Sequence, residues 1–194
     1  MRHASLNTVK LYLLWLLVVL MIGATVRASQ GGIYIEVFKL QPILTKTNTY
    51  KVQANLKYQL SDYLNKALLN GVTLKSDFKF YYKQPNNWFW NKQKLIANLK
   101  FQLKYHTLSR HYLLSRSDTN EHWNFGNLPA ALRKMGEIRN YELPRFPEKN
   151  KGDDSYISAI SSLESSTLNL PLRIQSFLSD KYNLVSGEAR WRLP

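Results

Sequence analysis

YKVQANLKYQL, residues 50–60, alternates apolar and polar side chains without a break. Successive side chains of a β-strand point to opposite faces, so one face of this segment is apolar and the other carries only Lys, Gln and Asn. This pattern predicts a half-buried strand of an antiparallel sheet, with one face in the core and the other in solvent.

Three further segments are predicted to be strands. VTLKSDFKFYYK, residues 72–83, and KLIANLKFQLKY, residues 94–105, alternate in the same way. In the second segment apolar residues occupy the odd-numbered positions from Leu95 to Tyr105, so we expect these side chains to face the core. YISAISSLESSTLNL, residues 156–170, fits a strand or a helix, and we interpret it as a strand.

Short helices with recognisable ends are predicted between the strands. Residues 61–71 have Ser61 or Asp62 as an N-cap and Gly71 where a left-handed residue ends a helix. Residues 127–136 have Asn127 as a cap, Pro in the first turn, and Gly136 as a terminator. Residues 171–182 space their apolar side chains as an amphipathic helix.

Long alternating strands with only short helices indicate a mainly β fold. We expect an antiparallel β-sandwich with two or three short helices, forming a single domain over residues 29–194. An immunoglobulin-like arrangement is compatible with this pattern, and a partly closed barrel is the alternative.

The N-terminal segment, residues 1–28, has the layout of a secretory signal. Arg2 and Lys10 precede the apolar run Leu11–Val26, and cleavage is expected after Ala28. The run has 16 residues, fewer than the ~20 that usually cross a bilayer, so we favour a signal peptide over a signal anchor. With either reading we expect the domain in the periplasm, and an uncleaved segment would contact the inner membrane through residues 11–26.

The charge and cysteine content restrict the partners. Lys and Arg number 27 against 13 for Asp and Glu, the formal charge is +14, and there is no Cys, which excludes disulfides and Cys-based sites. An exported basic protein is expected to meet an envelope protein or an anionic envelope component, such as lipid head groups or lipopolysaccharide, and not nucleic acid. The lysines predicted on polar strand faces, where charge also prevents edge pairing, are Lys51, Lys57, Lys75, Lys79, Lys83, Lys94, Lys100 and Lys104.

An aromatic cluster is the second candidate binding surface. Trp88, Phe89 and Trp90 follow a Pro-Asn-Asn turn signal, and Lys92 comes two residues later. Aromatic side chains beside Lys suit a protein hot spot or a membrane interface, although the two Trp rings could instead close one end of the core.

Signals of catalysis are weak in this sequence. It lacks a Gly-rich phosphate loop and a nucleophile elbow, and its few acidic residues are scattered. We therefore expect no enzyme activity and no cofactor, with a hydrolase as a disfavoured alternative.

His106 and His111 are the remaining candidates for a site. The apolar positions change parity after Tyr105, so the chain is expected to turn at Thr107 to Arg110. Across a four-residue hairpin loop the two imidazoles would be neighbours, whereas in a straight strand they would diverge. A metal would still need a third ligand, for which His122 or Glu121 is the nearest in sequence, and we expect no metal site.

The order of several motifs resembles an uncharacterised proteobacterial envelope family known as domain of unknown function 4390. The motifs are LNKALLNGVTLKSDFKFYY, WFW, YHTLSRHYLL, an NLPAAL helix, LNLPLRIQSFL and a final ARW, together covering roughly residues 33–191. The individual markers include Gly71, Tyr105, His106, Leu108, Ser109, Tyr112, Leu170 and Pro171.

The resemblance implies a signal-bearing or singly anchored envelope protein without an assigned activity. It also implies an association with a membrane sensor kinase, and hence a regulatory or structural binding role. Members usually have more aromatic residues after the last helix than this chain has in residues 181–194, KYNLVSGEARWRLP. The resemblance therefore implies no contact made by this C-terminal segment.

Overall fold

Two antiparallel sheets form the described part of the chain. The computed structural model describes residues 31–46, 48–84, 92–145, 154–165 and 183–193. The smaller sheet has the order β1-β2-β7, and the larger has the order β10-β8-β3-β4-β5-β6 with β9 also on β8. The strands are β1 (Gly32–Pro42), β2 (Tyr50–Gln59), β3 (Leu74–Gln84), β4 (Lys92–His106), β5 (His111–Arg116), β6 (Glu121–Phe125), β7 (Glu137–Glu142), β8 (Tyr156–Ser165), β9 (Asn183–Val185) and β10 (Ala189–Arg192).

The predicted class, mainly β and antiparallel with short helices, is confirmed. The strands predicted at residues 50–60, 72–83 and 94–105 are β2, β3 and β4, and the ambiguous segment at residues 156–170 forms β8 over its first ten positions. Two helices are present among the described residues, α2 (Asp62–Leu69) and α3 (Leu128–Gly136). The helix predicted at residues 171–182 lies outside the described residues.

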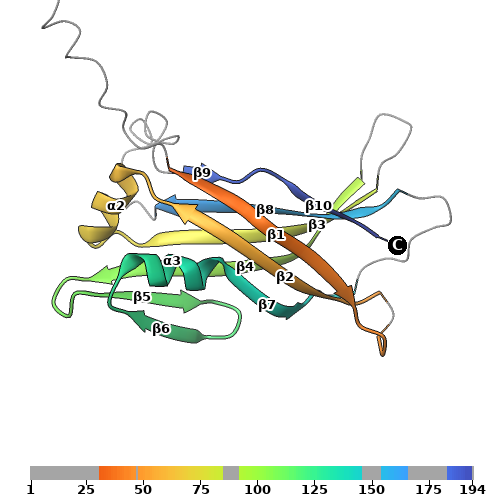
Figure 1. Ribbon diagram of the computed structural model, residues 1–194, viewed down its shortest axis with the longest axis horizontal. Helices are drawn as coiled ribbons and strands as arrows, with labels where there is room; N and C mark the ends of the chain where they lie inside the picture. Colours follow the sequence, from red (N-terminus) through yellow and green to blue (C-terminus); the bar gives the residue numbers. More distant parts are fainter. Residues whose placement is uncertain (1–30, 47, 85–91, 146–153, 166–182, 194) are drawn as a thin grey trace, which may run out of the picture.

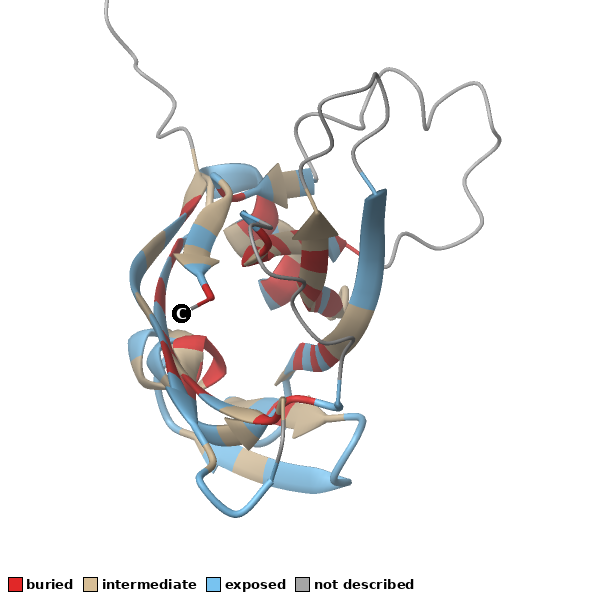
Figure 2. Ribbon diagram, turned by 90° about the vertical axis from the view of Figure 1, so that its right-hand side faces the viewer, coloured by how far each residue is buried: buried red, intermediate tan, exposed pale blue. Residues whose placement is uncertain are grey.

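The two sheets face one another across a shared core, with β1 and β2 crossing over β3 and β8 (Figure 1). Phe80 of β3 stacks against Phe38 of β1 and Tyr141 of β7, at centroid distances of 6.3 and 6.0 Å. The end-on view shows buried residues, coloured red, along the strands of the curved sheets (Figure 2). Aromatic stacking thus joins the sheets through the middle of the molecule.

A β-bulge in β4 corrects one sequence prediction. Ala97 pairs with Phe80 and Leu95 pairs with Tyr81, so Ile96 is an extra residue in β4. The bulge reverses which residues face the core, because each shift by one residue moves the side chains to the opposite face. Leu95, expected in the core, is 50% exposed.

The two helices begin as predicted, but one glycine acts differently. The Ser61 and Asn127 side chains accept hydrogen bonds from the backbone N–H groups of Leu64 and Ala130, at 3.3 and 2.9 Å. Gly71 has a φ of +87°, in the left-handed region predicted for it. Gly136 does not have a positive φ; it is needed because a Cβ there would lie 2.0 Å from the carbonyl oxygen of Leu56 on β2.

Among the described residues, no helix has the length and apolar character required to span a bilayer. The predicted signal or anchor, residues 1–28, lies outside them.

Candidate functional site

The β4–β5 hairpin brings the two histidines together. His106 and His111 are directly opposite in the ladder, and residues 107–110 form the turn between them, as the parity change predicts. Tyr105 and Tyr112 are the next pair, with ring centroids 4.9 Å apart.

Both imidazoles are hydrogen-bonded to the loop between them. The Ser109 backbone N–H donates to Nδ1 of His106 at 3.4 Å, and the Ser109 hydroxyl lies 3.1 Å from the same nitrogen. Nδ1 of His111 lies 2.5 Å from the Ser109 carbonyl oxygen, to which it donates. One nitrogen of each ring is thus hydrogen-bonded to the loop. Leu108, within the loop, is 90% exposed.

The described residues contain no group of three or more His, Cys, Asp or Glu side chains that could hold a metal. His122, the suggested third ligand, lies on β6, two strands away from His106. It is paired with Ser115 of β5. The geometry supports a structural role for the YHTLSRHY motif: it stabilises a tight hairpin.

The aromatic candidates Trp88, Phe89 and Trp90 lie outside the described residues, as do Leu170 and Pro171. Lys92 is exposed at the start of β4, where it pairs with Gln84.

The basic residues predicted on polar strand faces divide between the two sheets. Lys51 and Lys57 lie on β2, whereas Lys75, Lys79 and Lys83 lie on β3 and Lys94, Lys100 and Lys104 on β4. The structure therefore separates the predicted basic surface into two parts.

A zigzag of lysines crosses the outer face of the larger sheet. Lys75 pairs with Gln102 and Lys79 pairs with Asn98, which places Lys104, Lys75, Lys100 and Lys79 at successive diagonal positions about 7–8 Å apart. We call these four residues the lysine row. None of them forms an ion pair with another residue of the described chain, and all but the half-buried Lys79 are exposed.

Two acidic residues lie beside the lysine row. Asp77 is directly opposite Lys100 and accepts a hydrogen bond from the Asn98 side chain at 3.0 Å. Glu164 of β8 is directly opposite Lys75. The four lysines outnumber these acids, so the surface has a net positive charge.

At the other end of β3, Lys83 is neutralised. Lys83 forms an ion pair with Glu188, which also accepts from Arg190 at 2.7 Å. Burial raises the pKa of Glu188, but hydrogen bonds from Lys83 and Arg190 outweigh it and lower this pKa from 4.5 to about 2. The charge of Glu188 thus contributes to holding the segment before β10 against β3.

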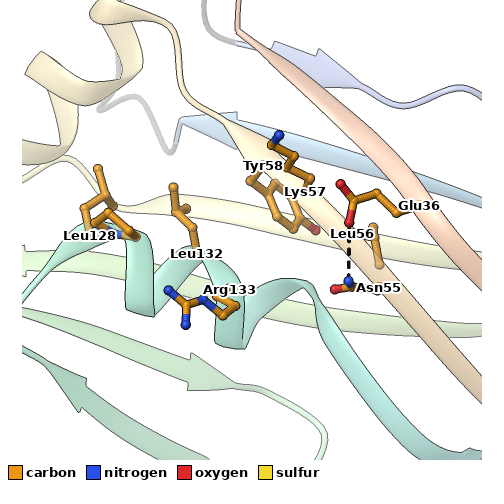
Figure 3. A pocket seen from close by; sticks show the side chains of 9 residues that line it. Glu36, Asn55, Leu56, Lys57, Tyr58, Leu128, Leu132 and Arg133 are labelled. Carbon is orange, nitrogen blue, oxygen red and sulfur yellow. Dashed lines mark hydrogen bonds between the residues drawn. The ribbon is translucent and has the colours of Figure 1, made fainter.

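A groove lies between α3 and the strands β1 and β2 (Figure 3). Its volume is about 430 Å³. Leu128 and Leu132 project from α3 on the side of β2, and Glu36 accepts a hydrogen bond from Asn55 at 3.3 Å (Figure 3). The lining residues are Glu36, Asn55, Leu56, Lys57, Tyr58, Leu128, Pro129, Leu132 and Arg133.

The family model for a domain of unknown function, DUF4390, matches residues 35–192. The chain belongs to this family. No curated protein and no solved structure matches the chain.

The sequence prediction missed the groove of this DUF4390 protein. The groove combines residues 55–58 of β2 with residues 128–133 of α3, which are far apart in sequence. Its signals in the sequence are the spacing of Leu128 and Leu132 in the predicted helix and the presence of Gly136, which the pattern predicts to be a helix terminator. They indicate that the helix packs closely on another element, but they do not identify that element as β2.

Proposed function

We propose that this DUF4390 protein is a non-enzymatic accessory protein of the bacterial envelope that binds an acidic partner protein in the periplasm. The lysine row carries the proposal, because its four ammonium groups have no acidic ion-pair partner in the described chain. Its partner is proposed to be a membrane protein, with a sensor kinase as the specific candidate, reached either from solution or from an N-terminal anchor.

The spacing of the lysine row suits recognition of a surface. The lysines project from two paired strands of a rigid sheet, so their backbone positions need no reorganisation on binding. Each exposed ion pair with a partner is expected to contribute about 0.2–1 kcal/mol. Binding should therefore weaken as salt is added, because the Debye length falls to about 8 Å near physiological ionic strength.

Binding of lipid or lipopolysaccharide is the alternative, and it would require a groove between the sheets. Phe38, Phe80 and Tyr141 stack across the middle of that space, and the Tyr58 hydroxyl bonds to both Ser76 and Ser161 across it. These contacts favour the protein partner. We infer that the architecture is a β-sandwich closed along one side, where β1 contacts β9 and β10.

Cosedimentation with inner-membrane vesicles from the bacterium that carries this chain tests the proposal. The variant K75Q/K79Q/K100Q should lose about 0.6–3 kcal/mol of binding free energy at low salt, which is about threefold to hundredfold in affinity. The control K39Q/K51Q/K66Q, which removes the same charge from β1, β2 and α2, should bind as the unmodified protein does.

Protease treatment of the vesicles distinguishes a protein partner from a lipid partner. Prior digestion of the vesicle proteins should abolish binding of the unmodified protein. Binding that survives digestion would identify lipid head groups instead, and equal binding by both lysine variants would refute the role of the lysine row.

A further inference from the structure

The groove beside β2 follows an edge of the strand. Four consecutive residues, 55–58, line it, and successive residues of a strand point to opposite faces. A groove lined by residues of both sets, in addition to Glu36 of β1, reaches the edge of the strand. On its other side, Leu128, Pro129, Leu132 and Arg133 form one face of α3.

This edge of β2 lacks a neighbouring strand over its last residues. β7 pairs with β2 from Lys51 to Asn55 and not beyond, because the chain preceding β7 is the helix α3. No described strand pairs with residues 56–59 on this side, while β1 pairs with them on the other.

The direction of the unpaired backbone groups follows from the ladder. The Leu143 N–H donates to the Tyr50 carbonyl at 2.9 Å, so Tyr50 directs its backbone groups toward β7. Every second residue of β2 does the same, which includes Leu56 and Tyr58. Gly136 lies close to the Leu56 carbonyl, whereas the Tyr58 N–H and carbonyl point toward the groove that Tyr58 lines.

The side chains around the groove add two preferences. Leu128 and Leu132 supply an apolar surface on the helix. Lys57 on the strand and Arg133 on the helix supply cations that form no ion pair within the described chain, while the carboxylate of Glu36 is bound to Asn55. A ligand with one apolar group and one carboxylate complements this arrangement.

We propose that the groove binds an extended segment of a partner protein, which adds to the smaller sheet as a strand along residues 56–59. One residue of the segment exchanges hydrogen bonds with the Tyr58 N–H and carbonyl. An apolar side chain packs on Leu128 and Leu132, and an acidic side chain meets Lys57 or Arg133. This site is independent of the lysine row, which lies on the other sheet, so either proposal can fail without the other.

Selection from a phage-displayed library of random octapeptides tests the groove. The target is the purified protein, and the comparison is the variant K57E/R133E. We expect peptides that contain an apolar and an acidic residue, and about a fivefold loss of affinity for each charge removed. The variant should select peptides with a basic residue in place of the acidic one, a reversal that a structural defect would not produce. K39E/K66E, which reverses two exposed charges on β1 and α2 outside the groove, is the matched control and should select the same peptides as the unmodified protein.

The mode of binding is tested with one selected peptide. Hydrogen exchange of the Tyr58 amide should slow when the peptide binds. In a set of peptides that each carry one N-methylated backbone amide, one peptide should lose binding, because the methyl group replaces the hydrogen donated to the Tyr58 carbonyl. Enrichment of no peptide, equal affinity for K57E/R133E, or protection of amides elsewhere without Tyr58 would overturn the proposal.

Discussion

Replacing Gly136 by Ala is expected to separate α3 from the edge of β2. The new Cβ would lie 2.0 Å from the carbonyl oxygen and 3.0 Å from the carbonyl carbon of Leu56. Both neighbours are backbone atoms of a paired strand, so neither can rotate away. Restoring an ordinary contact requires a displacement of more than 1 Å at the end of the helix.

The cost follows from what that displacement disturbs. Ala131 and Met135, on the same helix, are 0 and 1% exposed, so moving α3 loosens buried packing as well as relieving the overlap. Overpacking of a core typically costs 1–3 kcal/mol, and loss of the contacts of a buried Met costs a comparable amount. We expect G136A to lose about 3 kcal/mol of unfolding free energy.

Urea denaturation followed by tryptophan fluorescence measures the change. With an m-value of about 2 kcal/mol/M, the midpoint should fall by about 1.5 M. G126A is the matched control, because a Cβ at Gly126 meets nothing within 4 Å and this φ is not positive. Equal midpoints for G136A and G126A would refute the close approach of α3 and β2, and with it the geometry of the groove.

Three further predictions concern polar side chains. Tyr58→Phe removes a hydroxyl hydrogen-bonded to two buried serines and should lower stability by about 1–3 kcal/mol in the same urea assay, whereas Tyr34→Phe at an exposed position should not. The pKa of Glu188 is lowered from 4.5 to about 2, so its stabilisation is present above pH 4.5 and is lost as pH falls from 4.5 to 2. Thermal unfolding of Glu188→Gln should therefore show a weaker loss of Tm over that interval, and a loss as steep as in the unmodified protein would count against the ion pair. Calorimetric titration with zinc should release no heat attributable to His106 and His111, because the described residues place no third His, Cys, Asp or Glu side chain with them. Heat that disappears in H106A/H111A would contradict this structural role.

Alternation in the sequence predicted the strands because it follows directly from the geometry of extended chains. The four segments whose residues alternate, or nearly so, are β2, β3, β4 and β8. The hairpin at His106 and His111 was predictable for the same reason, since the apolar positions change parity at the turn. Local rules of capping likewise located the ends of α2 and α3.

Features that depend on distant parts of the chain were not predictable. The bulge at Ile96 lies in a run of three apolar residues, 95–97, where the pattern fits either register. The pairing of β2 with β7 joins segments more than 80 residues apart, so the unpaired end of β2 could not be recognised. The lysine row needed the alignment of β3 with β4, because the sequence predicts polar faces but not which lysines adjoin.

Crosslinking in living cells from position 102 tests the central claim most directly. Gln102 is exposed on the outer face of the larger sheet and is directly opposite Lys75. A photoreactive amino acid there should crosslink to an envelope protein, and the adduct should decrease in the K75Q/K79Q/K100Q background but not in K39Q/K51Q/K66Q. Absence of any protein adduct from the folded, correctly located protein, or an adduct unchanged by the loss of the three lysines, would contradict the account.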